Sequence, residues 1–208
     1  MAKKNTNENY IHSCDSDKVR IEDNICSILN MGYSHEQAMN ILNFYVFNAP
    51  ILHSNKNDSP FGLKTLKSYG WIGNELSKLE GRLLKTAGIG NFIFIKCNTI
   101  ENTLENMDLH QKICIEHPRA VLKQNFKPKI EENGIVQLLP CETRMECLFR
   151  HIRNSIAHNH TYLFENNNIL LEDRDENETI SALILIPKQA LIDWINVVDN
   201  KICNKIEN

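Results

Sequence analysis

The 208-residue sequence lacks the long apolar segments of membrane proteins. Its longest apolar runs, such as Ile93–Ile95 and Ala182–Pro187, are far shorter than the about 20 residues of a membrane-spanning helix. The first residues are polar and lack the apolar stretch of a signal peptide. The seven cysteines are odd in number and include no C-x-x-C pair, which is typical of free thiols in a reducing compartment. We therefore expect a cytoplasmic protein that does not associate with membranes.

The chain also lacks an excess of positive charge. Its 23 Lys and Arg against 26 Asp and Glu give a formal net charge of −3. This balance excludes a uniformly basic surface for nucleic acid but leaves room for a local basic cleft. Glycine and proline are few, at 8 and 6, and hydrophobic residues make up 42% of the chain. Such a composition is typical of a folded, helix-rich protein and excludes a disordered one.

Polar stretches divide the chain into three regions. Residues 1–18 are polar and are predicted to form a mobile tail. Apolar residues at three- and four-residue spacing over residues 19–60 predict a helical hairpin that packs on the remaining chain or forms a dimer contact. Within it, Ser34 and Gln37 fit a capping box at the start of the second helix. Residues 61–208 are predicted to form the main domain.

The last third of the chain has the clearest periodicity. Residues 125–140 read as a connection, and a helix is predicted over Cys141–His158. Two apolar runs that flank the polar segment Glu172–Glu178 predict a β-hairpin at about residues 169–186, and a final helix begins at Pro187. At 100° per residue, the Cys141–His158 helix has one apolar stripe, predicted to be its core face, which consists of Met145, Leu148, Phe149, Ile152 and Ile156.

Polar side chains occupy the opposite side of the same predicted helix. His151, Asn154 and His158 lie there, with Arg150 close to them and Arg153 at the border of the stripe. We therefore expect these groups to face away from the core. Six residues are predicted to concentrate positive potential around the helix end. They are Arg144, Arg150, His151, Arg153, His158 and His160.

The string Arg153-Asn154-Ser155-Ile156-Ala157-His158 resembles the signature of the HEPN superfamily, an Arg followed after four to six residues by a His near a helix end. The longer string FRHIRNSIAH, with the hairpin and the IPKQALIDW segment after it, is similar to HEPN domains encoded on bacterial plasmids and mobile elements. This resemblance covers about residues 138–200. It implies a mainly α fold, an antiparallel helical bundle with a small C-terminal β-hairpin. Many members are metal-independent ribonucleases of toxin–antitoxin or antiviral defence systems.

The residue types fit metal-independent RNA cleavage. The 2′-hydroxyl can attack the adjacent phosphorus when a proton acceptor, a proton donor and a cation are at hand. Histidine exchanges protons near neutral pH, and arginine is a permanent forked cation. We predict Arg153, Asn154 and His158 as catalytic residues, with Asn154 orienting the imidazole or binding phosphate. The supporting RNA contacts are predicted to be Arg144, Arg150, His151 and His160.

The resemblance also implies partners. It implies a homodimer in which two such helices face each other and assemble two copies of each group around one cleft for RNA. No cofactor and no metal are expected. Two alternatives remain open: a non-catalytic HEPN module that binds RNA, nucleotide or a partner protein, and a toxin neutralised by a nucleotidyltransferase antitoxin. In the second alternative, Tyr162 is a hypothetical acceptor of the nucleotide.

Other patterns carry less weight. A zinc site can be imagined from five side chains, but their spacing in the sequence is looser than that of the ligands in closed structural zinc sites. The five are His110, Cys114, His117, His158 and His160. Cys147 and His151 are one helical turn apart, yet a buried thiol is the more frequent meaning of such a cysteine.

Overall fold

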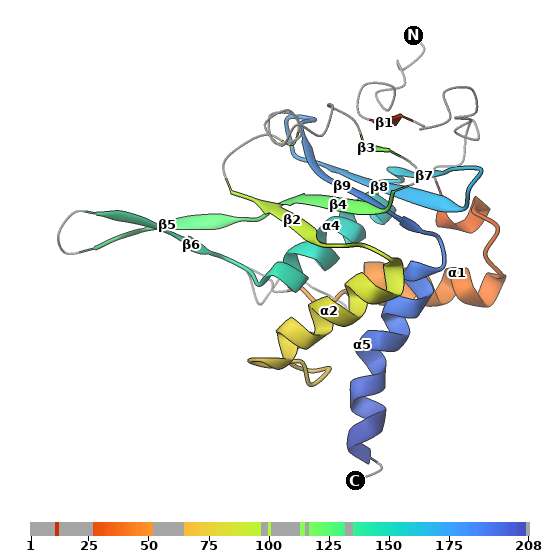
Figure 1. Ribbon diagram of the computed structural model, residues 1–208, viewed down its shortest axis with the longest axis horizontal. Coiled ribbons are helices and arrows are strands. Elements are labelled where there is room, and N and C mark those ends of the chain that lie inside the picture. Colours follow the sequence, from red (N-terminus) through yellow and green to blue (C-terminus); the bar gives the residue numbers. More distant parts are fainter. Residues whose placement is uncertain are drawn as a thin grey trace.

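The computed structural model describes residues 11–12, 27–51, 65–96, 100, 113–114, 117–131 and 135–206. Its centre is a five-stranded mixed sheet with the strand order β2-β4-β9-β8-β7 (Figure 1). Strand β2 pairs with β4 in parallel, and the other neighbours are antiparallel. The five strands are β2 (Phe92–Ile95), β4 (Arg119–Lys123), β7 (Thr161–Leu163), β8 (Asn168–Arg174) and β9 (Ile180–Pro187).

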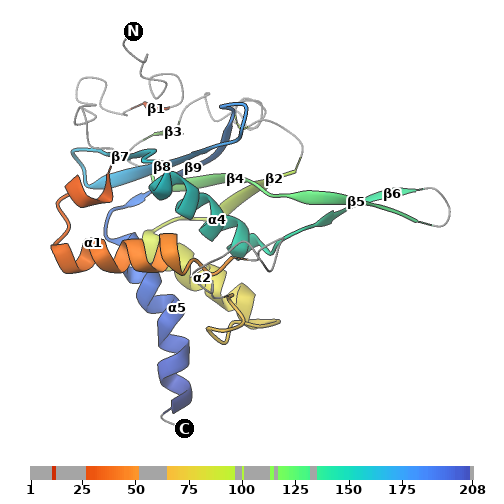
Figure 2. The same cartoon turned by 180° about the vertical axis from the view of Figure 1, so that it is seen from behind.

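Helices cover one face of this sheet (Figures 1 and 2). A short 3-10 turn, η2 (Ile28–Asn30), precedes α1 (His35–Ile41), which continues as the π-helical segment η3 (Leu42–Phe47). Helix α4 packs against β8 and against η3, while α2 packs against α5. The remaining helices are α2 (Glu75–Ala87), α4 (Arg144–Ala157) and α5 (Ala190–Ile206).

Two two-stranded pairings complete the described structure. Strands β1 (Ile11–His12) and β3 (Ile113–Cys114) pair in parallel. Strands β5 (Phe126–Ile130) and β6 (Val136–Pro140) pair antiparallel and project from the body as an arm (Figure 1). The sequence pattern indicated that residues 125–140 are a connection. The structure shows instead that they form two paired strands.

Both faces of the sheet are buried. On the helical face, alternate residues of the strands join the main core, with Trp194 and Phe149 among its largest members. The other face forms a second cluster that includes Leu170, Leu183 and Leu185, together with Ile100. Because β9 is covered on both sides, its residues from Ala182 to Pro187 form a continuous apolar run and lack an alternating pattern.

The prediction of a mainly α helical bundle with a small C-terminal hairpin is wrong. The two apolar runs at about residues 169–186 do pair as antiparallel strands, but β9 lies at the centre of the sheet and β8 beside it. Long-range pairing of β9 with β4, and of β4 with β2, builds a layer that the helices cover. Helical periodicity reveals nothing about such pairing, because it is a local property.

Two helices begin with a capping box, of which the sequence pattern predicted the first. The hydroxyl of Ser34 accepts a hydrogen bond from the Gln37 backbone N–H, and the Gln37 side-chain oxygen accepts one from the Ser34 backbone N–H, so the predicted capping box is confirmed. A second box, made by Thr143 and Glu146, starts α4 at Arg144. The apolar stripe predicted for α4 is also confirmed, because all its members are buried, namely Met145, Leu148, Phe149, Ile152 and Ile156.

Much of the predicted N-terminal architecture lies outside the described residues. This holds for most of the predicted tail at residues 1–18 and for two stretches of the predicted hairpin at residues 19–60. No helix in the described ranges is both long and apolar enough to cross a membrane.

Candidate functional site

The motif from Arg153 to His158 occupies the C-terminal end of α4. His158 caps this end: its side chain is exposed, and its backbone N–H donates to the carbonyl of Asn154 at 2.9 Å. Asn159 follows with a positive φ of 55°, a conformation that asparagine tolerates and that ends the helix. The chain then passes through His160 into β7. The negative end of the helix dipole therefore lies beside the His158 imidazole.

A second histidine lies next to His158. The ring centroids of His158 and His160 are 6.3 Å apart, and the two rings are inclined by 34°. The backbone of His160 is held on both sides, since its N–H donates to the Ser155 carbonyl at 2.8 Å and its carbonyl accepts from the Glu172 N–H at 2.9 Å. The structure thus brings together two imidazoles at the end of one helix.

Arg153 and Asn154 form a hydrogen-bonded chain that ends on β8. Arg153 Nη1 donates to Asn154 Oδ1 at 3.2 Å, and Asn154 Nδ2 donates to Asp173 Oδ2 at 3.2 Å. Asp173 therefore orients the Asn154 amide, which in turn holds the guanidinium. Both ends of that amide are engaged away from the His158 ring, so these contacts do not bear out Asn154 as the group that orients the imidazole. Asp173 does not feature in the sequence-based site.

His151 is buried, so the prediction that it faces away from the core is wrong. Its Nδ1 lies 2.6 Å from Asp173 Oδ2, and its Nε2 lies 3.2 Å from Arg150 Nη2 and 2.9 Å from the carbonyl oxygen of Lys123. Burial lowers the pKa of His151, and the Arg150 charge adds to this, although Asp173 acts in the opposite direction. The imidazole is then neutral, with its proton on Nδ1 donated to Asp173 and its Nε2 accepting from Arg150.

Arg150 is half-buried, and its guanidinium is held by hydrogen bonds. Its Nε and Nη2 donate to the two carboxylate oxygens of Glu142 at 2.9 and 2.8 Å, and Nη2 lies 3.2 Å from the carbonyl of Lys123. Burial alone would lower the pKa of Arg150, but the hydrogen bonds and charge of Glu142 outweigh it and raise that pKa. Arg150 and His151 therefore connect α4 to β4 and β8, and neither is presented as a free contact for RNA.

Arg144 lies at the opposite end of α4 from His158. Its Nη2 is 2.7 Å from a carboxylate oxygen of Glu80 and 3.3 Å from the carbonyl of Phe92, and its guanidinium carbon is 4.5 Å from the centre of the Phe94 ring. A helix of 14 residues separates the two ends. The structure therefore does not bring Arg144 to the predicted site.

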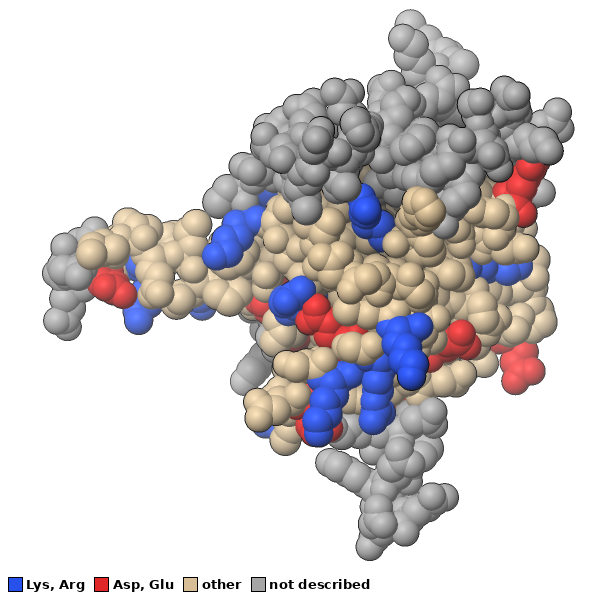
Figure 3. All heavy atoms as spheres, viewed as in Figure 1, with Lys and Arg blue, Asp and Glu red and all other residues tan. Residues whose placement is uncertain are grey.

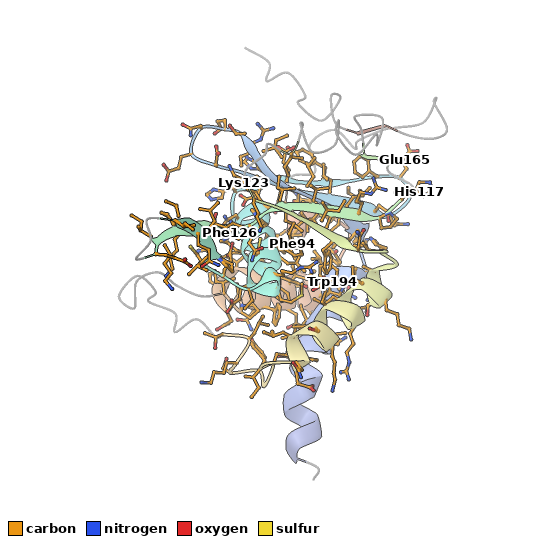
Figure 4. All side chains as sticks on the ribbon, turned by 60° about the vertical axis from the view of Figure 1, so that its left-hand side comes forward. Phe94, His117, Lys123, Phe126, Glu165 and Trp194 are labelled. Carbon is orange, nitrogen blue, oxygen red and sulfur yellow. The ribbon has the colours of Figure 1, made fainter. Side chains whose placement is uncertain are left out.

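An open polar cavity of about 390 Å³ borders this network. It lies between α4 and the turn that joins β8 to β9, and it is lined from α4 by Arg150, His151 and Asn154. Lys123 comes to the cavity from the end of β4, near the junction with the arm (Figure 4). Asp173 is also in the lining, and the segment Glu172–Glu178, which the sequence pattern marks only as a polar loop, supplies further side chains.

The surface charge agrees with the sequence balance. On the face shown in Figure 3, lysine and arginine side chains gather over α2, with acidic side chains among them. Exposed basic residues of α2 are Lys78, Arg82 and Lys85. This face therefore has no uniformly basic area.

The other predicted groups have ordinary surroundings. Tyr162 in β7 is half-buried and packs against the second cluster. Burial raises the pKa of the Cys147 thiol, whose sulfur lies 3.6 Å from the Lys123 carbonyl, which agrees with a structural cysteine. His110, part of the imagined zinc site, lies outside the described residues. In the part of the chain that the structure describes, no three His, Cys, Asp or Glu side chains are placed to hold a metal ion.

Comparison of the chain with protein-family models, curated proteins and solved structures produced no match.

Proposed function

We propose that this protein is a metal-independent endoribonuclease that cleaves RNA at the C-terminal end of α4. One observation carries the proposal: an exposed His158 has the His160 ring 6.3 Å away and follows, five residues along the chain, an arginine held through Asn154 and Asp173. Two imidazoles and a guanidinium are the groups that cleavage by the 2′-hydroxyl requires. The resemblance of Arg153–His158 to the HEPN signature supports the same chemistry.

The reaction needs no co-reactant beyond the RNA. One imidazole takes the proton of the 2′-hydroxyl, whose oxygen forms a bond to phosphorus while the bond to the 5′-oxygen breaks. The second imidazole, in its protonated form, gives its proton to that leaving oxygen. Arg153 stabilises the negative charge that grows on the phosphoryl oxygens. The products are a 2′,3′-cyclic phosphate and a 5′-hydroxyl.

A homodimer is the second part of the proposal. Two α4 ends that face each other would supply two copies of Arg153 and His158 to one cleft and double the local positive charge. Mixing an Arg153→Ala chain with a His158→Ala chain tests this sharing, because a site built from both subunits recovers part of the cleavage. A site contained within one chain stays inactive in the mixture.

The proposed cellular role is that of a toxin or a phage-defence effector in the cytoplasm. Unrestrained RNA cleavage harms the host, so we infer an antitoxin partner that holds the activity in check. Modification of Tyr162 by a nucleotidyltransferase is one form of such control. An added nucleotide mass on the Tyr162 peptide, absent from a Tyr162→Phe chain, is the observation that supports it.

The central experiment incubates purified protein with total RNA in the presence of a chelator and maps the RNA ends. We expect cleavage with cyclic phosphate ends. Arg153→Ala and His158→Ala are each expected to reduce cleavage by about 100-fold or more, the usual contribution of acid–base groups. His35→Ala, which removes an exposed histidine at the start of α1, is the matched control and keeps full activity.

Two results contradict the proposal. Undiminished cleavage by folded His158→Ala protein would show that this imidazole takes no part in catalysis. A strict requirement for Mg²⁺ would exclude the metal-independent mechanism. Tight RNA binding with no cleavage by the wild-type chain identifies a non-catalytic RNA-binding module instead.

A further inference from the structure

The arm formed by β5 and β6 has one apolar face. In the antiparallel register, Phe126 pairs with Pro140, Pro128 with Leu138, and Ile130 with Val136. Because alternate residues of a strand point to the same side, these three pairs share one face of the arm. The opposite face carries Lys127, Lys129, Gln137 and Leu139. The arm therefore has the two-sided pattern of a sheet that covers a core.

Within this single chain the apolar face is exposed. Ile130 is 73% exposed, Val136 58% and Leu138 44%. In Figure 3 much of the arm surface turned to the viewer is uncharged. A two-stranded hairpin is marginally stable by itself in water, and large exposed apolar faces mark interaction sites. The arm therefore has the composition of a surface that a partner covers.

The same face leads into an apolar cavity at the root of the arm. This cavity measures about 640 Å³, and its lining includes Phe126, Leu138 and Pro140 of the apolar face. Its charged lining residues are Lys96, whose ammonium lies 5.3 Å from the centre of the Phe126 ring, Arg144, which is paired with Glu80, and Glu142, which is paired with Arg150. Figure 4 shows Phe126 where the arm joins the body. The root is thus concave and apolar, with the positive charge of Lys96 at its edge.

The tip of the arm complements its own root. Ile130 and Val136 form the apolar end of the arm, and the exposed acidic residue Glu131 follows directly. An apolar, acidic tip fits an apolar, basic root in a second copy of the chain. A two-fold axis through the middle of the arm brings both tips onto both roots at once, as an isologous contact requires.

We propose that the apolar face of the β5–β6 arm is a self-association surface, on which a second copy of this chain docks its arm antiparallel, tip to root. Strands of five residues span about 17 Å, so the two arms overlap along their full length in this arrangement. A stable interface needs about 800 Å² from each partner, more than one short arm face offers. Tip-to-root packing adds the root cavity, whereas packing the tips alone would leave it uncovered.

This surface is separate from the proposed RNA site. The arm joins the N-terminal end of α4 through Cys141–Thr143, while His158 lies at the other end, about 21 Å away along a 14-residue helix. The homodimer proposed for RNA cleavage would use the other end of α4, so the arm contact is a second, independent interface, and its presence does not depend on the outcome of the RNA cleavage experiment.

Cross-linking tests the geometry directly. Cys141 is exposed and follows the root residue Pro140, so an Ile130→Cys tip is expected to react with Cys141 of a second chain through a short bismaleimide. The product is a covalent dimer whose linked peptides contain residues 130 and 141. Adding Cys141→Ser to the Ile130→Cys variant is expected to abolish that product. The matched control is Gln137→Cys, which places the new cysteine on the polar face and is expected not to give the tip-to-root cross-link.

A charge exchange tests the same contact without cross-linker. Glu131→Lys and Lys96→Glu are each expected to raise the dissociation constant of the dimer by about 10-fold, measured by analytical ultracentrifugation of the full chain. The double variant is expected to recover the wild-type dissociation constant. Lys129→Glu on the polar face is expected to leave the dimer unchanged. A wild-type chain that stays monomeric at high concentration, or a dimer insensitive to both Ile130→Asp and Glu131→Lys, overturns the proposal.

Discussion

Asp173 determines how the polar side of α4 is arranged. One of its carboxylate oxygens receives the Nδ1–H of His151 and the amide of Asn154, so a single strand residue orients two helix side chains and, through Asn154, the Arg153 guanidinium. Hydrogen bonds to an ionised group in a buried place are stronger than neutral ones. The candidate site therefore depends on contact between β8 and α4, elements separated in the chain by β7.

The buried His151 makes stability depend on pH. Its pKa lies below the ordinary value of 6.5, chiefly because burial penalises the imidazolium. Below that pH the unfolded chain binds a proton that the folded chain does not, so the free energy of unfolding falls as the pH is lowered through 6.5 toward the folded pKa. Above 6.5 the full stability is present. Urea unfolding of wild type measured at several pH values is expected to show this loss.

Replacement of the histidine isolates its contribution. His151→Gln cannot be protonated, so its stability is expected to depend less steeply on pH between about pH 7 and 5 than that of wild type. His35→Gln removes an exposed histidine and is the control for a general effect of losing one imidazole. Equal slopes for wild type and His151→Gln would show that His151 does not carry the dependence.

The misplacement of His151 has a clear physical reason. A helical wheel assumes one buried side, and its stripe from Met145 to Ile156 was predicted correctly. Helix α4, however, is covered on two sides, by η3 and by the sheet at β8 and β4. His151 lies toward the sheet, where Asp173 accepts from its Nδ1–H and Arg150 donates to its Nε2. A polar side chain can be buried there because the tertiary contacts supply hydrogen-bond partners that offset the free-energy cost of removing it from water.

Capping sets the start of α4 at the level of the element. The Thr143 hydroxyl accepts from the Glu146 backbone N–H, and a Glu146 oxygen accepts from the Thr143 N–H at 2.9 Å. Thr143→Ala is expected to cost about 1 kcal/mol of the free energy of unfolding. Thr143→Ser keeps the hydroxyl and is expected to cost much less. Urea unfolding of both variants measures the difference, and equal losses would rule out the cap as the cause.

Strands were harder to predict than helices. The Cys141–His158 pattern is long and periodic, and α4 lies within it. Strand β4 has only five residues, and β5 contains Pro128, which reads as a break in the chain. Short apolar runs are ambiguous between strand and buried helix until a partner strand is known. Pro128 is tolerated because the arm has only two strands, so each is an edge.

At the scale of the whole molecule, the sheet is a central layer with two buried faces. Ile184 faces the main core and Leu183 the second cluster, and both are fully buried. Ile184→Ala and Leu183→Ala are therefore each expected to lower the free energy of unfolding by about 2–5 kcal/mol. In a small surface hairpin, as the sequence pattern implied, only one of these two neighbouring residues would be buried, so only one of the two substitutions would lower the free energy of unfolding.

An exposed isoleucine is the matched control for these core variants. Ile72 is 55% exposed, and Ile72→Ala is expected to change the free energy of unfolding by less than about 0.5 kcal/mol. Chemical unfolding of the three variants is the measurement. A loss at Ile184 with none at Leu183 would mean that the second face of the sheet is not packed.

The sequence by itself determined local features of this protein: the capped start of α1, the stripe of α4, and an arginine and a histidine at its end. These depend on neighbours three to five residues apart, which hydrophobic spacing and capping rules describe. Only the tertiary structure decided the order of the strands, the burial of His151 and the part played by Asp173. Those features depend on residues brought together from distant parts of the chain, and local patterns contain no information about such pairings.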